Sequence, residues 1–593
     1  MEALGEVTRS PFVLPKKRGL GWLTGGLERL LGLRRLHELY QTVPPGSVDD
    51  FLENALAVLG VRWRLASGTP ACIPETGSVL VVANHPFGGI DGIVLAQMLR
   101  QRRPDVKILT NAMLGRITEL SELFLPVDVL SSAAQRDNAR GLRAAYNHLD
   151  GGGLLLLFPA GQVAALQLKA RGVVEPPWNP LLARLCLRTQ PSVVPVFIEG
   201  CNSALFQAAG LLHKRLRTAL LPRQLLNKNR AEISVRVGQA LPPKDYEGIV
   251  NPRGLTDFLR LHTFLLSRPN GAAAQSHVRS QQQLAAAALP ARQEAELATL
   301  PARCLLDTHR DLRVYCASAA QLPVILPELG RLRELSFRGA GEGTGRPCDL
   351  DRFDAVYRHL FVWDSRRKCI AGAYRIGFVD QLIAAGGVTA LYTRSLFRYN
   401  RAFLDNMGGC IEMGRSFVHP DYQRSLGVLN LLWRGIGRLV SDQPRYHTLF
   451  GPVSISADYS HLARQLMFNC LTLHYYDDAN AATVRPVKPF RAGRPPWTRD
   501  MLKTVANGST LSRLISRMEG GRGLPVLLRQ YLNLNGRFVC FNVDPTFGNT
   551  LVGLVVVDLR RTPRRFLKRF LTPSGMSRLG DAADVAGTKT SVE

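Results

Sequence analysis

One short stretch of the sequence carries the residue types of a proton-transfer site. Val79–Ala83 is a run of small and branched apolar residues, which predicts a buried parallel strand. Asn84 and His85 follow at its end, and Asp91 comes shortly after the histidine. A histidine whose ring is oriented by a carboxylate can take the proton of a hydroxyl group. The alternative is a loop histidine beside an aspartate that caps a helix over residues 92–103.

Alternating strands and helices through residues 46–267 must position this pair. Leu154–Phe158 and Val193–Ile198 are fully apolar runs, and both end in segments that contain glycine. Such alternation predicts an α/β fold with a mostly parallel sheet, in which ligand sites form where strands end. The other predicted elements of this half are helices at Asp50–Leu59, Asn138–Leu149 and Leu181–Leu187, and strands at Lys107–Leu109, Phe124–Val127 and Ile233–Gly238.

A second α/β unit is predicted from about Leu305 onward. A glycine-rich segment, Gly339–Gly345, precedes a cluster of aspartates at positions 349, 351 and 354. The predicted elements are helices at Leu322–Leu335, Val428–Val440, Tyr459–Met467 and Pro525–Leu532, and strands at His359–Trp363, Ile370–Phe378, Ile411–Val418, His447–Gly451, Phe538–Val543 and Leu551–Asp558.

Composition divides the chain into five segments. With 593 residues it is too long for one core. Residues 1–45 form a basic amphipathic segment, and 46–267 the first domain. Residues 268–297 are rich in Ala and Gln without apolar periodicity and are predicted to be a linker. Residues 298–570 form the second domain with its extension, and 571–593 a disordered tail.

Charge and cysteine content limit the partners and the compartment. The 75 Lys and Arg outnumber the 47 Asp and Glu, so the net charge is +28. A chain this basic is expected to meet a polyanion, either nucleic acid or an anionic membrane surface. The ten cysteines have no metal-like spacing, which predicts free thiols in a reducing compartment and no metal site. No bound cofactor is expected either. No signal peptide or membrane-spanning run is expected, so we predict a peripheral protein on the cytoplasmic face of the inner membrane.

Basic residues gather near both ends of the chain. Residues 9–35 hold seven Lys or Arg against the single Glu28, and their leucines follow helical spacing. This pattern fits a helix in a membrane interface or an amphipathic helix packed on the domain. Arg560–Arg569 holds six basic residues with Phe566 inside it and Phe570 beside it, and fits a membrane surface or a solvated basic tail.

The motifs of residues 75–240 resemble the glycerolipid acyltransferase family, the 1-acylglycerol-3-phosphate acyltransferases and their relatives. Asn84-His85-Pro86 through Asp91 is similar to the family's His–Asp box. Phe158-Pro159-Ala160-Gly161 is similar to its Phe-Pro-Glu-Gly block, and Val194–Val196 to its fourth block. The segment Leu114–Val127 takes the position of the second block.

Two departures from that family pattern resemble its hemolysin-like branch. Five residues instead of four separate His85 from Asp91, and the glycines Gly88 and Gly89 can absorb the extra residue. Ala160 replaces the family's glutamate. The resemblance implies O-acyl transfer in which His85 is the base and Asp91 orients its ring. It implies substrate contacts from Asn84, Gly88, Gly89, Phe158, Pro159, Ala160 and Gly161.

Residues 305–480 resemble the ornithine N-acyltransferases, which share the GNAT fold. The matching stretches include Leu332-Arg333-Glu334 and Glu412 through Pro420. The resemblance implies that a phosphopantetheine arm lies at the end of strand Ile411–Val418 and at the following helix N-terminus. The residues implied in carrier binding are Val418, Gln423, Arg424 and Gly427.

The same resemblance implies the catalytic roles of this half. Glu412 accepts the amine proton, and Arg415 pairs with it or binds the carboxylate of the amino acid. The aspartates hold a cationic side chain such as that of ornithine, together with Arg375 in the substrate site. The alternatives are a structural ion pair for Glu412 and Arg415 and a solvated loop for the aspartate cluster. The substrate-binding aspartates are Asp349, Asp351 and Asp354.

With both halves in this order, the chain resembles the bifunctional ornithine lipid synthases, a glycerolipid acyltransferase αβ domain followed by a GNAT-fold domain. The resemblance implies N-acylation of ornithine by the second half and O-acylation of the lyso-lipid by the first. The donor is acyl-acyl carrier protein or acyl-CoA, and the partners are the carrier protein and an anionic membrane. The alternatives are another amino acid or a glycerophospholipid as acceptor, one noncatalytic half, or a nucleic-acid-binding protein.

Overall fold

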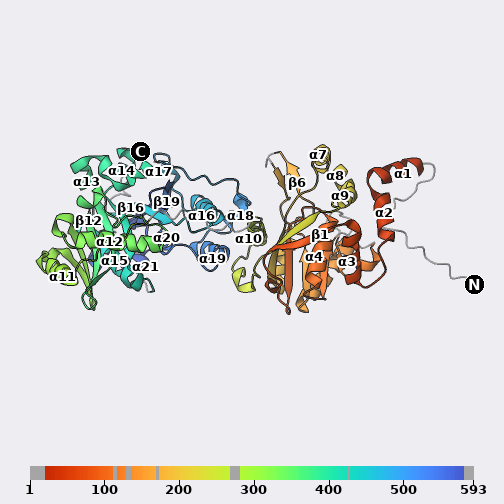
Figure 1. Ribbon diagram of the computed structural model, residues 1–593, viewed down its shortest axis with the longest axis horizontal. Coiled ribbons are helices and arrows are strands. Elements are labelled where there is room, and N and C mark those ends of the chain that lie inside the picture. Colours follow the sequence, from red (N-terminus) through yellow and green to blue (C-terminus); the bar gives the residue numbers. More distant parts are fainter. Residues whose placement is uncertain are drawn as a thin grey trace, which may run out of the picture. The chain divides into compact units, whose positions relative to one another are not determined.

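The computed structural model divides the chain into two compact units (Figure 1). Unit 1 comprises Met1–Pro269 and Pro496–Thr504, and unit 2 comprises Asn270–Pro495 and Val505–Glu593. The chain therefore passes between the units three times. The structure describes residues 12, 21–110, 117–127, 135–168, 172–267, 281–424 and 427–579, without the side chains of 21–24, 135–138 and 214.

Unit 1 contains a seven-stranded sheet in the order β1-β9-β8-β2-β5-β3-β4. Its strands pair in parallel except β8 with β9. The strands are β1 (Arg62–Ser67), β2 (Val79–Ala83), β3 (Val106–Thr110), β4 (Phe124–Pro126), β5 (Leu154–Leu157), β8 (Ser192–Ile198) and β9 (Glu232–Val237), with the hairpin β6 (Ala165–Gln167) and β7 (Gly172–Val174) outside the sheet.

The helices of unit 1 surround this sheet. They are α1 (Gly21–Leu30), α2 (Leu33–Gln41), α3 (Val48–Leu59), α4 (Gly89–Arg100), α5 (Gln135–Asp150), α6 (Leu181–Thr189), α7 (Ala204–Leu212), α8 (Lys214–Ala219), α9 (Leu221–Leu226), α10 (Pro252–Leu265) and α18 (Arg499–Lys503).

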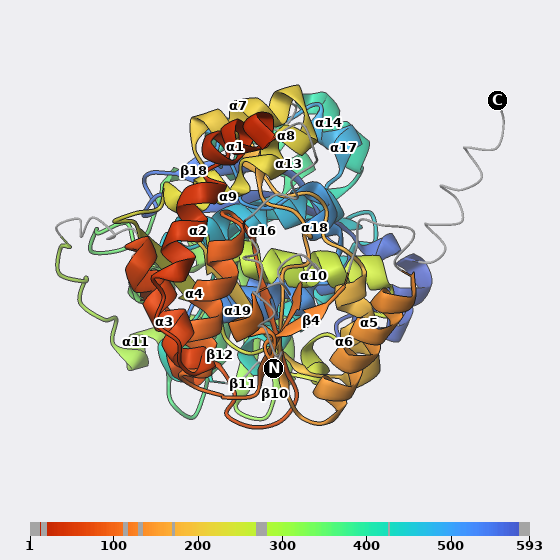
Figure 2. The same ribbon diagram turned by 90° about the vertical axis from the view of Figure 1, so that its right-hand side faces the viewer.

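Alternation along β2 explains how the sheet is covered on both faces. Val79 and Val81 join a core with α3 and α4, whereas Leu80 and Val82 join a core with α5, α6 and α10. Successive strand residues point to opposite faces, so a strand buried on both sides reads as a continuous apolar run. Figure 2 shows α3 and α4 on one flank and α5 and α6 on the other.

Unit 2 contains an eight-stranded sheet in the order β10-β11-β12-β13-β15-β16-β19-β18. Its strands are β10 (Leu305–His309), β11 (Leu312–Ser318), β12 (Arg358–Asp364), β13 (Cys369–Phe378), β15 (Cys410–Val418), β16 (Thr448–Ile455), β18 (Arg537–Asp544) and β19 (Thr550–Asp558), with a separate pair β14 (Phe397–Arg398) and β17 (Arg485–Pro486). Its helices are α11 (Pro290–Thr299), α12 (Ile325–Gly339), α13 (Val379–Gly386), α14 (Arg401–Met407), α15 (Gly427–Asp442), α16 (His461–His474), α17 (Asp478–Ala481), α19 (Gly508–Met518), α20 (Val526–Asn533) and α21 (Arg564–Leu567).

Two neighbouring strands of this sheet separate along their length. β15 runs parallel to β16, and in these fully described strands their pairing covers Cys410–Glu412 and then stops. Gly451 allows the close approach at this point, because a Cβ there would lie 2.0 Å from the Met413 carbonyl oxygen. Beyond it, Arg415 has a φ of +50°, and the register of β15 against β13 shifts in the same region. This bulge turns β15 away from β16.

The predicted α/β class is confirmed in both units, and most predicted strands match within two residues. Within the predicted linker 268–297, Gln282 donates a backbone hydrogen bond to Gly345, and helix α11 begins at Pro290. The predicted disordered tail 571–593 is wrong at its start, because Leu571 and Leu579 are buried. Among the described residues, no helix is long and apolar enough to cross a bilayer.

Candidate active sites

His85 and Asp91 meet at the carboxyl end of β2. Asp91 lies in the first turn of α4, where its Oδ2 accepts hydrogen bonds from the backbone N–H groups of Phe87 (2.9 Å) and Gly88 (3.0 Å). The same oxygen lies 2.9 Å from His85 Nδ1, at an ion-pair distance without the alignment of a good hydrogen bond. Because Nδ1 faces the carboxylate, Nε2 is the nitrogen that can take a proton.

Two residues that the sequence analysis did not single out hold His85 in place. The backbone N–H of His85 donates to Glu175, and Trp178 Nε1 donates to the other oxygen of this carboxylate (2.9 Å). Burial raises the pKa of Glu175. The ring of Phe158 lies 4.5 Å from the imidazole, centroid to centroid. The sequence signal was Glu-Pro-Pro-Trp, in which the prolines stiffen the segment between acceptor and donor.

The residues beside the histidine have separate structural roles. The side chain of Asn84 is buried, and it accepts from Ile198 N (2.6 Å) and donates to Ile198 O (2.8 Å). It therefore joins β2 to β8, and we assign it to positioning rather than to the predicted substrate contact. Gly88 has a φ of +108°, which favours glycine, whereas Gly89 is the first residue of α4 and has space around its Cα. Gly88 alone supplies the unusual conformation that the longer box requires.

A large apolar cavity opens beside His85. Its volume of about 860 Å³ lies in the usual range for small-ligand sites. Gly88, Gly89 and the predicted block Phe158–Gly161 line this cavity together with His85, and so do Arg217 and Arg253. Apolar side chains from α2, α3, α4, α7 and α9 also line it. The cavity suits an acyl chain with its reacting end at the imidazole.

Helix α2 packs on unit 1, whereas Leu27 and Leu30 of α1, which lie within the basic residues 9–35, are exposed. Leu36 is buried, and Leu33, Leu39 and Tyr40 line the cavity. The hydroxyl of Tyr40 donates to Glu119 (2.7 Å). The two interpretations of residues 9–35 stay predictions, because α2 lies beyond most of that segment and most of residues 1–20 lies outside the described residues.

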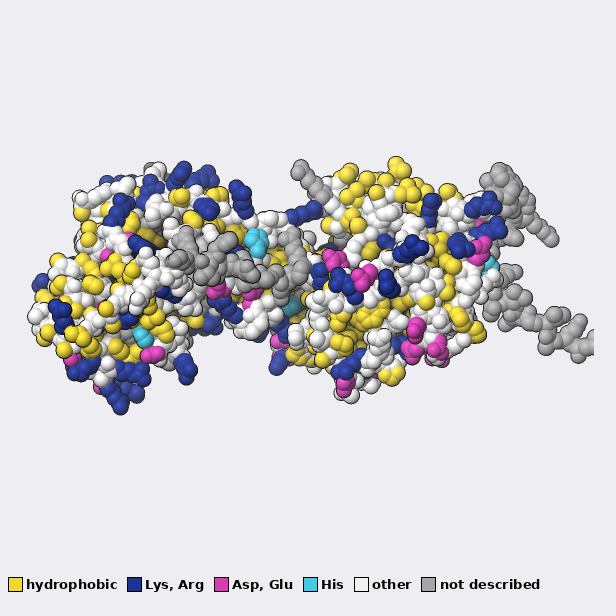
Figure 3. Space-filling model, viewed as in Figure 1, with side chains coloured by type: hydrophobic (Ala, Val, Ile, Leu, Met, Phe, Trp, Pro, Cys, Tyr) yellow, Lys and Arg dark blue, Asp and Glu magenta, His cyan; other side chains and the backbone are white. Residues whose placement is uncertain are grey.

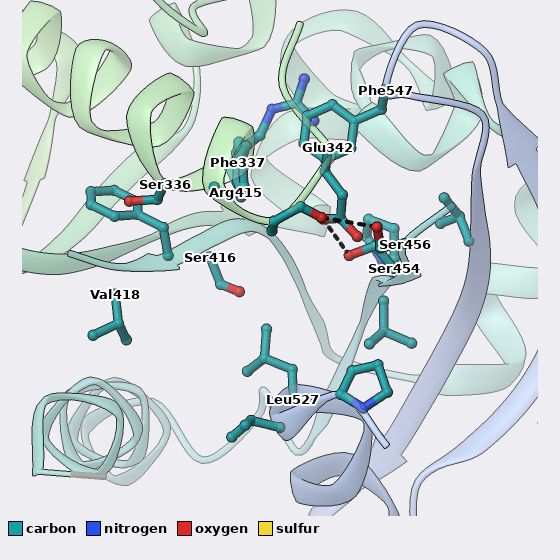
Figure 4. A pocket seen from close by; sticks show the side chains of 18 of the residues that line it. Ser336, Phe337, Glu342, Arg415, Ser416, Val418, Ser454, Ser456, Leu527 and Phe547 are labelled. Atoms are coloured by element: carbon teal, nitrogen blue, oxygen red, sulfur yellow. Dashed lines mark hydrogen bonds between the residues drawn. The ribbon is translucent and has the colours of Figure 1, made fainter. Parts of the chain in front are cut away.

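A second cavity, of about 590 Å³, lies in unit 2 where β15 and β16 diverge. Arg415–Val418 of β15 and Pro452–Ser454 of β16 form opposite walls, and α12 and α20 contribute Phe337 and Leu527. In Figure 4, Glu342 points toward Ser454 and Ser456, with Arg415 and Phe547 on the same side. Strand edges that are not paired with each other offer backbone groups to an extended ligand.

Glu342 lines this cavity, as does Asp544, and the sequence analysis did not assign Glu342 a role. It accepts a hydrogen bond from Ser454 Oγ (2.9 Å). Burial raises its pKa to about 7, helped by the negative charge of Asp458 and opposed by Arg522. Glu342 lies inside the glycine-rich segment Gly339–Gly345, which was its sequence signal. A carboxylate that titrates near neutral pH is suited to general-base catalysis.

Glu412, in contrast, is sealed away from the cavity. Its carboxylate accepts from the Tyr357 hydroxyl and from the backbone N–H of Thr393 (2.6 Å), and the residue is 1% exposed. Burial raises its pKa. The predicted role as proton acceptor is therefore not supported by the geometry, and neither is the alternative ion pair with Arg415. Glu412 instead joins β15 to two neighbouring segments.

The predicted aspartate cluster forms a buried ion-pair network. Neither a free binding site for a cationic side chain nor a solvated loop matches this arrangement. The pairs are Arg415 Nε with Asp349 Oδ2 (2.9 Å), Arg375 Nη1 with Asp351 Oδ1 (2.7 Å), and Arg333 Nη1 with Asp354 Oδ1 (2.6 Å). The first of these is an ion-pair distance without aligned hydrogen bonds. Arg415 also lines the cavity, whereas Arg375 is 1% exposed and positions the aspartates.

The predicted carrier-binding residues divide into two groups. Val418 and Gln423 line the cavity, and Gln423 Nε2 donates to the Val418 carbonyl (2.9 Å). Arg424 is exposed, and Gly427 is the first residue of α15, with residues 425–426 between them outside the described part of the chain.

Comparisons with known proteins agree with this division. A family model described as acyltransferase matches residues 33–273, and one described as acetyltransferase (GNAT) domain matches residues 332–434. The fold and the two cavities thus define an acyltransferase that has one domain of each of these two types.

Three relatives indicate which kinds of acyltransferase this chain is similar to. The chain is 32% identical over 253 residues to the glycine N(alpha)-acyltransferase of Phocaeicola vulgatus, covering 40% of this chain and 76% of that protein. It is 25% identical over 222 residues to the lyso-glycine lipid O-acyltransferase of the same organism, covering 36% and 75%. It is 32% identical over 110 residues to the L-ornithine N(alpha)-acyltransferase of Rhizobium meliloti, covering 18% and 36%. The chain belongs to the family of the first of these N(alpha)-acyltransferases.

Proposed function

We propose that this protein makes a diacylated amino-acid lipid by two successive acyl transfers. Unit 2 transfers a 3-hydroxyacyl group to the α-amino group of ornithine, and unit 1 esterifies the hydroxyl of that product with a second acyl chain. The observation that supports this proposal most directly is that each unit encloses its own cavity with its own proton acceptor, His85 in unit 1 and Glu342 in unit 2.

In unit 2 the neutral amine attacks the carbonyl carbon of the acyl thioester. A C–N bond forms, the C–S bond breaks, and Glu342 accepts the proton that the amine loses. The thiolate leaves and takes up a proton to become the free thiol. Arg415 reaches the same cavity and is suited to pair with the carboxylate of the amino acid.

In unit 1 the hydroxyl of the lyso-lipid attacks a second thioester. His85 Nε2 takes the hydroxyl proton as the C–O bond forms and returns it to the departing sulfur. Asp91 stabilises the protonated ring, because its buried carboxylate lies against Nδ1. Such a base supplies about 10²–10⁴-fold in rate.

The proposed acyl donor is acyl-acyl carrier protein, with acyl-CoA as the alternative. An acidic carrier suits a chain with a net charge of +28. The gap between β15 and β16 suits an extended pantetheine arm whose amides pair with strand backbone. Val418 and Gln423 lie along that path.

The proposed amino acid is ornithine, and glycine is the second candidate. Besides Glu342, Asp544 lines the unit 2 cavity. Its Oδ1 accepts hydrogen bonds from the backbone N–H (2.9 Å) and the hydroxyl (2.6 Å) of Thr546, and we propose that the same carboxylate also pairs with a second ammonium group of ornithine. Glycine is favoured by the relative that shares 32% identity over 253 residues. When the two labelled amino acids compete, the label that is incorporated into lipid will decide between them.

The overall proposal is tested by lipid analysis of a host without aminolipids. We expect wild-type protein to produce diacylated ornithine lipid, His85→Ala to leave only the monoacylated form, and Glu342→Gln to produce neither. Glu412→Gln is the matched control, because it changes the other buried glutamate, and it should keep both products. Absence of any amino-acid lipid with the wild type, or both lipids with Glu342→Gln, would contradict the proposal.

A further inference from the structure

Helices α7 and α8 present large leucines to solvent. Leu205, Leu211, Leu212 and Leu216 are 56%, 46%, 81% and 50% exposed, and the exposed Arg215 lies among them. We call these five residues the α7–α8 face. Soluble proteins seldom leave several large aliphatic side chains exposed together, and such patches mark interaction surfaces.

Neighbouring elements extend this apolar surface. Strand β6 packs against α7, and its hairpin carries Leu168 (73% exposed) and Val173. Helix α1 carries the exposed Leu27 and Leu30, and Arg223 of α9 donates to the Leu30 carbonyl (3.4 Å). Figures 1 and 2 both place α1, α7 and α8 at the upper end of unit 1, and Figure 3 shows hydrophobic side chains along that edge.

The charge of this region favours an anionic partner. Residues 200–231 contain six Lys or Arg and no Asp or Glu. Arg215 and Arg230 are exposed, as is Arg29 on α1. Two copies of a face with one sign of charge repel each other, which disfavours self-association through it. Leucines interleaved with arginines are typical of elements that lie in a membrane interface.

The same helices also enclose the cavity of unit 1. Phe206 of α7, Arg217 and Thr218 of α8, and Leu221 and Leu225 of α9 line it. These helices therefore lie between the His85 cavity and the α7–α8 face. A lyso-lipid in a bilayer would reach the cavity through the elements that contact the bilayer.

We infer that the α7–α8 face, with α1 and the β6–β7 hairpin, docks unit 1 on an anionic lipid surface and so supplies the acceptor to the His85 cavity. The leucines enter the acyl boundary, and the arginines meet lipid phosphates. The supply of acceptor rests on the proposed O-acyl transfer, whereas the docking itself is measured without turnover.

The test is co-sedimentation of the full chain with phosphatidylcholine vesicles, with and without phosphatidylglycerol. We expect wild-type binding to require phosphatidylglycerol. The double variant Leu212→Ser/Leu216→Ser should bind vesicles at least about tenfold more weakly, because two apolar side chains are lost from the interface. Arg215→Gln should bind about fivefold more weakly, as expected for one charge near an anionic leaflet. The matched controls are Val250→Ser, which is 78% exposed in the loop before α10, and the exposed Lys244→Gln.

A second measurement separates this inference from the proposed function. With a detergent-dispersed lyso-lipid, the double variant should transfer acyl groups like the wild type, whereas His85→Ala should bind vesicles but not transfer. Vesicle binding by the double variant equal to wild type would overturn the inference. The inference would also be overturned if the double variant bound vesicles normally but differed from the wild type in its oligomeric state, or in its binding to acyl carrier protein or duplex DNA.

Discussion

Glu342 titrates near neutral pH because burial disfavours its charged form. We expect N-acyl transfer to rise as the pH increases through about 7, since the carboxylate accepts a proton only when ionised. Glu342→Gln should lower the rate at least about 10²-fold and remove this pH dependence. The measurement is thiol release from an acyl thioester across a pH series.

Two charged neighbours of Glu342 allow the direction of this pH dependence to be tested. Asp458 raises the pKa of Glu342 and Arg522 lowers it. Asp458→Asn should therefore move the rise in rate to lower pH. The raised pKa also favours the folded state at acidic pH, and this contribution is lost as the pH rises toward about 7. A pH profile that is identical in both proteins would argue against Glu342 as the base.

Glu412 is also a buried glutamate, but unlike Glu342 it is not expected to take part in N-acyl transfer. Glu412→Gln should keep most of the N-acyl transfer and its pH dependence, because the side chain does not reach the cavity. It should lower the free energy of unfolding by about 1–2 kcal/mol through the altered bond to Tyr357. Urea unfolding alongside the thiol-release assay checks both. Complete loss of activity in a folded Glu412→Gln variant would support Glu412 as the proton acceptor, which is the role that the sequence predicted.

Single residues show where prediction from sequence succeeds. His85 and Asp91 are close in the chain and follow one buried strand, so their meeting was predictable. Glu342 depends on Ser454, which is 112 residues away, and no local pattern reports that contact. The aspartates were recognised as a cluster, but the arginines that pair with them come from three distant elements.

Among the elements, the turn into α4 depends on one of its two glycines. Gly88→Ala should lower the free energy of unfolding by about 1–3 kcal/mol and reduce O-acyl transfer, because a Cβ disfavours φ of +108°. Gly89→Ala, the matched control, has no atom within 4 Å of its new Cβ and should leave stability unchanged or slightly higher. Thermal unfolding of both variants makes the comparison, and equal destabilisation would contradict the assignment.

The close approach of β15 and β16, just before the two strands diverge, depends on Gly451. Gly451→Ala should cost about 1–3 kcal/mol of unfolding free energy, because its Cβ would meet the Met413 carbonyl at 2.0 Å. Gly414→Ala on β15 would meet only Tyr392, at 3.9 Å, and is the control. Urea unfolding measures the difference. A stable Gly451→Ala protein with full N-acyl transfer would show that this contact does not set the geometry of the cavity.

Elements with strong apolar patterns were predictable, and those without them were not. Strands such as β2 and β5 are buried on both faces and read as continuous apolar runs. Strand β1, at a sheet edge, has the sequence RWRLAS. It was not predicted, because its charged residues interrupt the apolar pattern. Helices α7–α9 were missed because their leucines are divided between the cavity and solvent, which weakens the periodic signal.

At the scale of the whole molecule, the boundary of unit 1 is not one cut in the sequence. Trp497, Met501 and Leu502 are buried, and α18 packs against α10 within unit 1. A protein truncated to residues 1–269 should therefore have a lower unfolding temperature than the same protein with residues 495–505 appended through a flexible linker. Scanning calorimetry of the two proteins checks this, and equal unfolding temperatures would show that α18 adds nothing to stability.

The return of residues 496–504 to unit 1 has a consequence during synthesis. Domains usually fold in order as the ribosome releases them. Here the N-terminal unit lacks one of its helices until most of the second unit has been translated, so the side of α10 that awaits α18 stays open on the nascent chain. Unit 1 is thereby completed only after strands β10–β16 of unit 2 have been synthesised, and before β18 and β19 of the same sheet have been made.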